Sequence, residues 1–407
     1  MSKKKTLHVP DAPFRPGEKP DFSNLELPKA GDAKKPKIMV EPSEIRDLAF
    51  SLVRVLDDKH EAVGPWDPKL DASVLKKGLR HMSLLRIFDD RMLTMQRQGK
   101  LSFYMKSLGE EAVAIAQGMA LRSDDILFPS YRQPGLQFVR GRDIVDMICH
   151  CITNVKDNVK GRQMPVHYSW KEGNFVSISS PVGTQFPQAV GCAMASAYKG
   201  EDNVSISWVG DGTAAEGDFH YALNFASVYK APVLLNVVNN QWAISTHKNI
   251  SSGGATFAAR GIAYDVPSIR VDGNDFLALY SVTSWAAERA RKGGGPTFIE
   301  VFTYRGEAHS TSDDPTRYRP KDEWKSWPLG DPIERLKAHL IGLETWSEKE
   351  QNKLEKELDA LVIKSYKEAE KHGTLSEGPW APEDTLFEDV YKKPPRHLRK
   401  QRQEFGF

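Results

Sequence analysis

Residues 204–242 read VSISWVGDGTAAEGDFHYALNFASVYKAPVLLNVVNNQW, and this stretch decides the fold. The runs at 204–209 and 233–238 are short and rich in β-branched residues, which predicts two buried strands. Residues 215–229 between them have the length and composition of a helix. Strand, helix and strand at this spacing predict a parallel βαβ crossover. The expected fold class is therefore α/β, with a mostly parallel sheet flanked by helices.

Other segments complete an outline of the chain. Apolar residues recur at helical spacing over 72–99, and a second helix is expected after Gly109. A further strand is expected at 298–305 (FIEVFTYR), and a charged helical region follows residue 331. Residues 1–40 are rich in Pro, Lys, Asp and Gly, which indicates an arm lying over another part of the protein, or disorder. We expect three parts: an N-terminal arm and linker (1–71), an α/β domain (72–330), and a C-terminal helical segment and tail (331–407).

Composition excludes several classes of function. A formal net charge of +2 over 407 residues gives no sign of nucleic-acid or membrane binding. The three cysteines, Cys149, Cys151 and Cys192, have neither disulfide-framework nor zinc-site spacing, so we expect free thiols. No apolar run approaches the roughly 20 residues of a membrane span, and the start MSKKKTLHVP lacks the apolar stretch of a secretory signal. We expect a cytoplasmic protein.

Chemistry-bearing residues stand where the two strands of the 204–242 stretch end. Gly210-Asp211-Gly212 follows the first strand, and Asn239-Asn240-Gln241-Trp242 follows the second. Ligands of open α/β sheets bind outside the carboxyl ends of the strands. The glycines permit close approach and the helix N-terminus attracts anions, but Asp211 would repel a phosphate unless a cation mediates. Carboxylate, amide and carbonyl oxygens suit Mg²⁺, although Gly-Asp-Gly alone would also suit a plain turn.

This combination resembles the thiamine-diphosphate motif of transketolase-like and 2-oxo acid decarboxylating enzymes. The resemblance implies the thiamine-diphosphate-binding fold, and it implies that Asp211, Asn240 and the backbone oxygen of Trp242 bind Mg²⁺. It also places Gly210, Gly212 and Thr213 at the cofactor. Tyr131-Arg132, within FPSYR, resembles the Tyr-Arg pair whose Arg binds the diphosphate, as a bidentate guanidinium can. Without the resemblance, Arg132 would suit a surface turn equally well.

Two further segments are similar to branched-chain 2-oxo acid dehydrogenase α subunits. They are GRQMPVHY (161–168) and SSPVGTQ (179–185). In that family the second segment lies against the aminopyrimidine, which implies that Ser180 and Val182 bind the cofactor. Some members hold a monovalent cation there, which implies a possible K⁺ site formed by Ser179, Pro181, Thr184 and Gln185. From the residues alone the segment is simply a polar start of a helix over 184–199. The small residues of that helix allow close helix approach, and the resemblance implies a subunit interface there. From composition alone, an alanine-rich core helix is the alternative.

The loop RGEAHSTSDDPTRYR (305–319) resembles the active-site loop of the same enzymes. Its His309 would contact the cofactor and act catalytically in transfer to the lipoyl group, and we expect it to titrate near neutral pH. The alternative is a solvated loop histidine. In eukaryotic relatives the Ser after that His is phosphorylated, which here is Ser310, but the motif alone does not imply a kinase. The family's tail pattern recurs at 387–391 (FEDVY).

Two positions depart from the family pattern. A basic residue often precedes Asn-Asn and touches the diphosphate, whereas here Val238 occupies that place. The acidic metal ligand is Asp211, where some animal relatives use Glu. The first departure leaves one phosphate contact unassigned.

The resemblance implies partners and a reaction. A single diphosphate-binding unit implies a separate β subunit that supplies the pyrimidine-activating Glu, in an α₂β₂ heterotetramer. The implied reaction is oxidative decarboxylation of branched-chain 2-oxo acids, with acyl transfer to the lipoyl group of a dihydrolipoyl acyltransferase core. One alternative is the α subunit of a pyruvate or acetoin dehydrogenase. Another, from a different class, is a non-catalytic subunit with the same fold.

Overall fold

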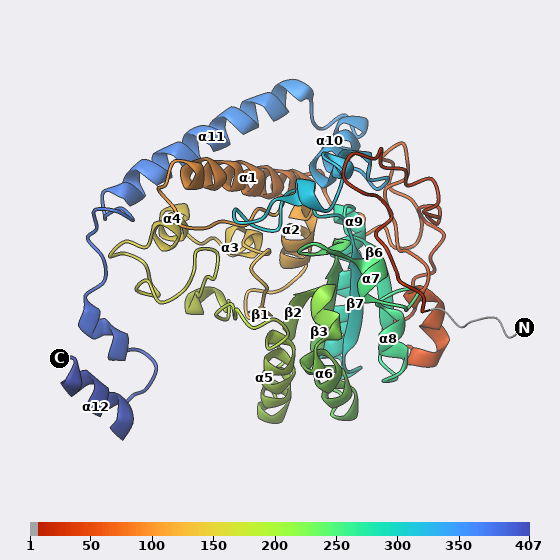
Figure 1. The fold of residues 1–407 in the computed structure, drawn as a ribbon. Helices are drawn as coiled ribbons and strands as arrows, with labels where there is room; N and C mark the ends of the chain where they lie inside the picture. Colours follow the sequence, from red (N-terminus) through yellow and green to blue (C-terminus); the bar gives the residue numbers. More distant parts are fainter. Residues whose placement is uncertain (1–6) are drawn as a thin grey trace, which may run out of the picture.

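The centre of the protein is a five-stranded parallel sheet, seen in a computed structural model that describes residues 7–407 (Figure 1). The strand order is β1-β2-β3-β7-β6, and every neighbouring pair is parallel. This confirms the predicted α/β class. The strands are β1 (Ile126–Phe128), β2 (Ser205–Gly210), β3 (Val233–Asn239), β6 (Ser268–Asp272) and β7 (Thr297–Phe302).

The predicted βαβ crossover is confirmed. Strands β2 and β3 pair in parallel from Ser205↔Val233 to Gly210↔Val238, so both end at the same edge of the sheet. The segment between them begins with a short 3₁₀ helix, η3 (Gly212–Ala215), before helix α6 (Gly217–Val228). The sequence therefore predicted the helix two residues too early, because it did not separate the 3₁₀ turn from the α-helix.

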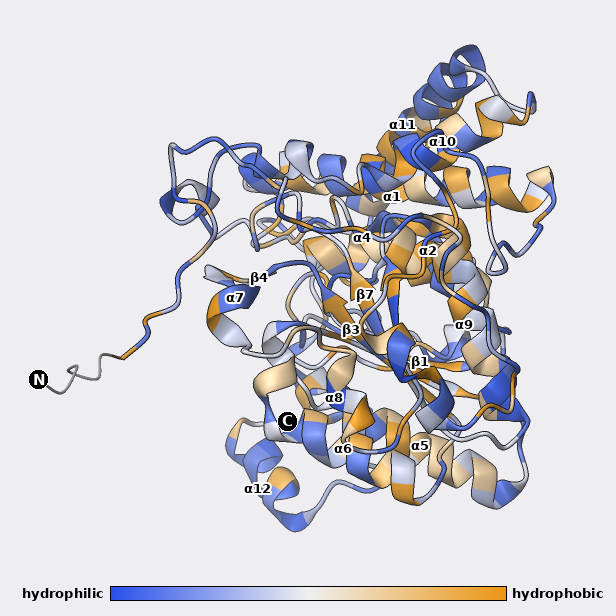
Figure 2. Cartoon of the chain, turned by 90° about the vertical axis from the view of Figure 1, so that its right-hand side faces the viewer, coloured by the Kyte–Doolittle hydropathy of each residue, from blue (hydrophilic) through white to orange (hydrophobic). Residues whose placement is uncertain are grey.

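Helices cover both faces of the sheet, and alternate residues of the central strand face opposite sides. On β3, Leu234 and Val238 belong to one hydrophobic cluster and Leu235 and Val237 to the other. Such alternation follows from the two-residue period of a strand. The first cluster includes α1 (Ala72–Arg97), α2 (Glu111–Met119) and α9 (Phe276–Arg291), and the second includes α5 (Gln185–Lys199) and α6. Figure 2 shows the hydrophobic colour concentrated on the central strands.

Two strands of the five-stranded sheet escaped prediction, and one was predicted too long. β1 has three residues and β6 carries Arg270 and Asp272, so neither presents an uninterrupted β-branched run. The strand expected at 298–305 is β7, which ends at Phe302 and leaves Thr303, Tyr304 and Arg305 in the following loop.

The remaining elements are short and mostly connect the main ones. They are η1 (Pro42–Ala49), α3 (Gly135–Val139), α4 (Ile144–Ile152), η2 (Lys171–Gly173), β4 (Trp242–Ala243), β5 (Thr246–His247), α7 (Lys248–Ser251), α8 (Ala259–Ile262), η4 (Pro315–Arg317) and η5 (Glu323–Ser326). β4 and β5 form an antiparallel two-stranded ribbon at the end of β3.

The N-terminal arm packs against the rest of the protein from Ala12 onward, whereas residues 7–11 are exposed. The Arg289 guanidinium on α9 donates to the carbonyls of Ile38 and Val40 at 3.0 and 2.9 Å. Val53 forms a parallel bridge to Val271 in β6, which extends the sheet edge. The sequence analysis left open whether the N-terminal arm lies over another part of the protein or is disordered, and the structure shows the first of these. The first six residues of the predicted arm lie outside the described residues.

The predicted C-terminal helical segment is confirmed by α10 (Pro332–Gly342) and α11 (Glu348–Glu370). The segment predicted as a tail contains two further helices that the sequence analysis did not predict, η6 (Glu383–Phe387) and α12 (Arg396–Glu404). Helices α10 and α11 share a hydrophobic cluster with α1, and α11 runs along α1 and α4 (Figure 1). The domain boundaries at 71 and 330 stay predictions. Within residues 7–407 no helix is both long and apolar enough to cross a membrane.

Candidate active site

Asp211 follows the last residue of β2 and is only 4% exposed. Its Oδ1 accepts a hydrogen bond of 2.8 Å from the backbone N–H of Gly212. Its Oδ2 is buried and has no hydrogen-bond partner within residues 7–407. Burial raises the pKa of this carboxyl to about 7, because desolvation disfavours the charged form. A buried carboxylate oxygen without a partner is costly unless a cation binds it, so this geometry suits a cation ligand.

Asn240 and Trp242 follow β3, the neighbouring strand. The Asn240 side-chain Nδ2 donates to Glu110 at 2.7 Å, and its Oδ1 accepts from the backbone N–H of Trp242 at 3.3 Å. The Trp242 carbonyl accepts from the Arg305 guanidinium at 3.0 Å. Each of these oxygens has a second lone pair that stays available to a metal ion.

A close backbone approach brings the Asp211 turn and the Asn240–Trp242 turn together. A Cβ built on Gly212 would lie 2.5 Å from the Cβ of Ala243, closer than real side chains approach. Gly212 is thus required for contact between the two turns. Around a Cβ built on Gly210 there is open space instead. Thr213 is buried in the first turn of η3. The sequence prediction that these strand-end residues meet at one edge is consistent with this packing.

Arg132 lies on the loop after β1 and is 3% exposed. Its guanidinium donates to the Lys106 carbonyl at 2.5 Å and to the His309 carbonyl at 3.0 Å. The nearest carboxylate is Glu110, 3.5 Å from the Arg132 Nε. A buried guanidinium held mainly by backbone carbonyls is suited to bind an anion in a fixed orientation.

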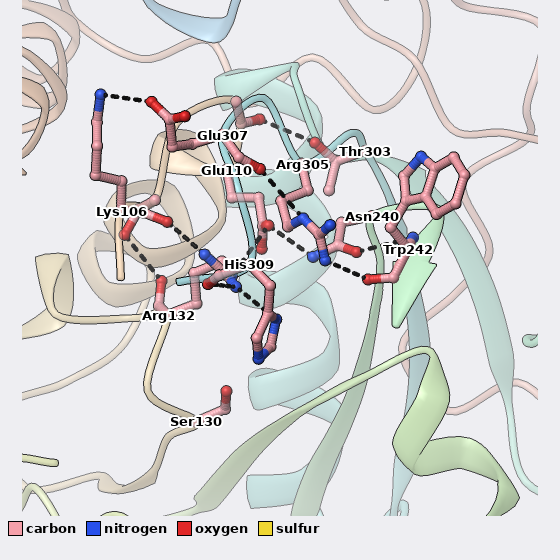
Figure 3. Close-up of polar contacts among 12 residues, drawn as sticks. Lys106, Glu110, Ser130, Arg132, Asn240, Trp242, Thr303, Arg305, Glu307 and His309 are labelled. Carbon is pink, nitrogen blue, oxygen red and sulfur yellow. Dashed lines mark hydrogen bonds and ion pairs between the residues drawn. The ribbon is translucent and has the colours of Figure 1, made fainter. Parts of the chain in front are cut away.

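Arg305 is a second buried guanidinium that the sequence analysis did not single out. It is 1% exposed, and its partners are neutral: the carbonyls of Trp242, Ile244 and Glu307 and the hydroxyl of Tyr318. Burial, then the nearby Arg132, lowers the pKa of Arg305 to about 10. Figure 3 shows both guanidiniums with Asn240 and Trp242. The site therefore contains two buried cations that lack a full counter-charge.

His309 lies in the loop after β7, next to Arg132. Its Nδ1 is 3.4 Å from the Arg132 Nη2, and its backbone N–H donates to Asp313 at 2.8 Å. Burial, together with Arg132 and Arg305, lowers the pKa of the imidazole to about 3. The expectation that this histidine titrates near neutral pH is wrong for the protein without ligands, because two cations surround a half-buried ring. His309 is neutral here, and it is not a freely solvated loop residue.

A row of rings and polar groups joins His309 to the segment before α5. The Tyr131 ring lies 5.8 Å from the His309 ring and 6.4 Å from the His167 ring, between centroids. The His167 Nδ1 is 3.2 Å from the Ser180 hydroxyl. The structure thus brings the predicted residues Tyr131, Ser180 and His309 to one side of the site. His167, from the GRQMPVHY motif, joins them as an unpredicted member.

The residues predicted to hold K⁺ form a small group at the start of α5. The hydroxyls of Ser179 and Thr184 both donate to the Pro181 carbonyl, at 3.3 and 3.2 Å. Gln185 donates to the Trp208 carbonyl at 3.0 Å, and its buried Oε1 has no hydrogen-bond partner among the described residues. Val182 is 43% exposed, so this edge of the site is open. Four oxygen-bearing residues therefore lie in one short segment.

The donor set fits Mg²⁺ and an anionic cofactor. Mg²⁺ prefers one or two carboxylates together with phosphate oxygens and water, and the orphaned Asp211 oxygen supplies such a carboxylate. In the part of the chain that the structure describes, no three His, Cys, Asp or Glu side chains gather as a metal cluster. The three cysteines are free thiols, as predicted.

Three site residues were missed, and each for a different reason. Arg305 stands just past a strand's carboxyl end, so the strand-end rule that found Asp211 could have found it. Glu110 stands at the start of α2. The sequence predicts a helix start there, but it does not show that the Glu110 side chain faces the site. His167 was quoted within a motif but was given no role, because nothing in the sequence places it near Tyr131.

Comparison with known proteins yields two matching family models. The model described as dehydrogenase E1 component matches residues 79–377. A second, described as the N terminal of the 2-oxoisovalerate dehydrogenase E1 alpha subunit, matches residues 3–43. The first covers more than half of the chain, including the strand ends and the loop with His309.

Curated relatives match over most of their lengths. The 2-oxoisovalerate dehydrogenase subunit alpha of Pseudomonas aeruginosa is 57% identical over 401 residues, which cover 98% of each chain. The mitochondrial 2-oxoisovalerate dehydrogenase subunit alpha of Homo sapiens is 38% identical over 369 residues, covering 90% of this chain and 81% of the human protein. The Arabidopsis thaliana subunit alpha 1 is 37% identical over 387 residues, covering 94% and 80%.

Proposed function

The chain belongs to the family of dehydrogenase E1 components, and we propose that it is the α subunit of a thiamine-diphosphate-dependent branched-chain 2-oxo acid dehydrogenase. The enzyme decarboxylates acids such as 3-methyl-2-oxobutanoate, which is 2-oxoisovalerate. It passes the acyl group to the lipoyl group of a dihydrolipoyl acyltransferase. The observation that carries the proposal is the buried Asp211 oxygen without a partner, at the strand ends where Arg132 and Arg305 also lie buried.

Magnesium and the diphosphate would be held from the two strand ends and the Arg132 loop. Asp211, Asn240 and the Trp242 carbonyl supply oxygen ligands to the ion. Arg132 and Arg305 supply positive charge, which in a buried site stabilises a diphosphate strongly. Val238 occupies the position where the family often has a basic residue that touches the diphosphate. The Arg305 guanidinium would supply a positive charge to the diphosphate in its place. Gly210 leaves room for close approach of the ligand.

Cofactor and protein have separate tasks in the reaction. When bound, thiamine diphosphate supplies the nucleophilic carbon and the electron sink that loss of CO₂ requires. The protein binds and orients the cofactor and excludes water. His309 is neutral, and its Nδ1 faces the Arg132 donor, so its proton is on Nε2. We propose that this ring positions and exchanges a proton during acyl transfer to the lipoyl group.

Potassium binding is a separate part of the proposal. Ser179, Pro181, Thr184 and Gln185 supply three kinds of uncharged oxygen within one segment, and the Gln185 Oε1 has no other partner among the described residues. Uncharged oxygens suit a large monovalent cation. Such an ion would hold Ser180 and Val182 in place at the cofactor.

A β subunit partner is supported by the exposed apolar face of α5 and α6, and we propose an α₂β₂ assembly. Large apolar side chains on these two helices, and that of Tyr229 directly after α6, are exposed to solvent: Tyr198, Tyr221, Phe225, Val228 and Tyr229. On α5, Gly191 has open space around it. Exposed apolar patches of this kind mark protein–protein contact sites. The β subunit would add the carboxylate that activates the aminopyrimidine. We also propose a cytoplasmic location.

Substrate preference is the direct test of the proposed function. The chain, assembled with its β partner, Mg²⁺ and thiamine diphosphate, is assayed with 3-methyl-2-oxobutanoate, its branched homologues and pyruvate, with an artificial electron acceptor. The expected result is a higher kcat/KM for the branched acids. A higher kcat/KM for pyruvate would replace the proposal by a pyruvate dehydrogenase. Absence of turnover with every acid, despite bound cofactor, would favour a non-catalytic subunit.

A further inference from the structure

Two adjacent buried glutamates begin α2, and they point to different neighbours. Glu111 is fully buried and pairs with Arg86 of α1 at 2.7 Å, and it accepts from the Gly109 N–H at 2.9 Å. Glu110 is 1% exposed, and its side chain interacts instead with Asn240 and Arg132. The two residues share charge, size and burial, but Glu111 joins α2 to α1, whereas Glu110 faces the site.

Glu110 contacts one residue of each half of the site. Its Oε1 accepts a hydrogen bond of 2.7 Å from the Asn240 Nδ2, and the same oxygen lies 3.5 Å from the Arg132 Nε. Figure 3 shows Glu110 with Asn240 and Arg132 around it. One carboxylate oxygen therefore joins the metal side of the site to the diphosphate side.

The contact decides which end of the Asn240 amide is available to a metal. An ionised carboxylate can only accept hydrogen bonds, so the amide must direct its NH₂ group at Glu110 and its Oδ1 elsewhere. The Glu110 Oε1 lies 2.7 Å from the Asn240 Nδ2 and 3.5 Å from the Arg132 Nε, so it faces two N–H donors and acts as an acceptor toward both. Without this carboxylate the amide could turn over, because its two ends are similar in size, and an NH₂ group cannot bind Mg²⁺.

We propose that Glu110 is a positioning residue that orients the Asn240 side chain as a magnesium ligand and holds Arg132 for the diphosphate. The inference rests on the proposed function of the site, because it needs Mg²⁺ and thiamine diphosphate as ligands. Groups that orient metal ligands are commonly worth about 10–100-fold in metal affinity. Glu110 therefore acts on the affinity for the ion through Asn240, without touching the ion itself.

The test is a calorimetric titration of MgCl₂ into the full chain assembled with its β partner, at a fixed concentration of thiamine diphosphate. In Glu110→Ala the Mg²⁺ concentration for half-saturation should rise about 10–100-fold. Glu110→Gln offers Asn240 a donor as well as an acceptor and has no charge for Arg132, so its half-saturation should lie between those of Glu110→Ala and the wild type. Glu111→Gln is the matched control, since it changes an equally buried neighbour, and its half-saturation should equal that of the wild type.

Each outcome separates the inference from the proposed function. Wild-type half-saturation in Glu110→Ala, or an equal rise in Glu111→Gln, would overturn the role of Glu110. A wild-type assembly that binds no thiamine diphosphate with Mg²⁺ would instead overturn the proposed function. Should Glu110→Ala fail to assemble, Glu110→Asp serves as the second variant. It keeps the charge but shortens the reach to Asn240, so the same rise is expected.

Discussion

Two aspartates stand at strand ends of the same sheet, and both are buried, yet their surroundings differ. Asp272 ends β6 and is 0% exposed; its Oδ2 pairs with Arg335 at 2.8 Å and lies 3.7 Å from Arg54. Asp211 follows β2, and its Oδ2 has no partner within residues 7–407. Burial raises the pKa of both carboxyls. The arginine partner of Asp272 therefore marks a carboxylate that stabilises the fold, whereas the unpartnered Asp211 oxygen marks a carboxylate that is suited to bind a ligand.

The paired carboxylate joins distant parts of the chain. Arg335 belongs to α10 and Arg54 to the N-terminal arm, so Asp272 binds the sheet to both. Removing one partner from a buried ion pair leaves an uncompensated charge, which is strongly destabilising. By contrast, removing Asp211 from the unliganded protein removes a charge that has no counter-ion. The two sites should thus respond oppositely to the same substitution.

The largest expected effect is the loss of stability when Asp272, the paired aspartate, is replaced. Asp272→Ala should lower the free energy of unfolding by about 3–5 kcal/mol, because the Arg335 guanidinium stays buried without its main partner. Urea unfolding followed by circular dichroism measures the loss, with Asp211→Ala as the matched control. Equal midpoints for the two variants would show that the distinction between the two aspartates is wrong.

A substitution of His309 in the ligand-binding site can separate acyl transfer to the lipoyl group from decarboxylation. His309→Ala should suppress acylation of an isolated lipoyl domain about 10²–10⁴-fold, the usual cost of losing a positioned acid–base group. Decarboxylation, followed with an artificial electron acceptor, should fall far less, because the cofactor itself supplies the electron sink. Equal losses in the two assays would assign His309 to cofactor or substrate binding. No loss in either would return it to an ordinary loop residue.

A smaller effect concerns pH and the unliganded chain. The pKa of Asp211 is about 7 when folded, against 3.8 as the ordinary value. Between about pH 4 and 7 the folded state retains a proton that the unfolded state has released, so stability falls as pH rises through this window. Asp211→Asn removes the dependence, and it should stabilise the unliganded protein by about 1–3 kcal/mol at pH 8.

Thermal or urea unfolding at pH 5 and pH 8, without Mg²⁺ or cofactor, measures this prediction. The difference in stability between the wild type and Asp211→Asn should be smaller at pH 5 than at pH 8. A variant that is less stable than the wild type at pH 8 would contradict the view that the Asp211 charge is uncompensated.

Local pattern explains which parts of this architecture could be predicted. The β2-α6-β3 unit has two short runs rich in β-branched and other apolar residues, each followed by polar residues at the strand end. Periodicity and the parallel-sheet rule therefore located Asp211 and Asn240. β6 carries charged residues and β1 is too short to show a pattern. Those two strands are defined by their neighbours in the sheet, which the local sequence does not reveal.

Long-range contacts explain what escaped prediction in the site. Glu110 and Asn240 are 130 residues apart in the sequence and meet because α2 packs on the sheet. The low pKa of His309 comes first from burial in the folded protein, and then from Arg132, which lies 177 residues away, and from Arg305. The local sequence around Glu110 or His309 does not indicate either of these long-range contacts. A motif can therefore name ligands, but the groups that orient them and tune their protonation appear with the tertiary structure.

Calorimetric titration of thiamine diphosphate with Mg²⁺ into the assembled Asp211→Ala variant tests the central claim most directly. The unpartnered Asp211 oxygen is the one charged metal ligand assigned at the strand ends, so the account predicts a loss of at least about 100-fold in Mg²⁺-dependent cofactor affinity. The unfolding transition of the variant should match that of the wild type or exceed it. Unchanged cofactor affinity in a folded Asp211→Ala protein would contradict the account.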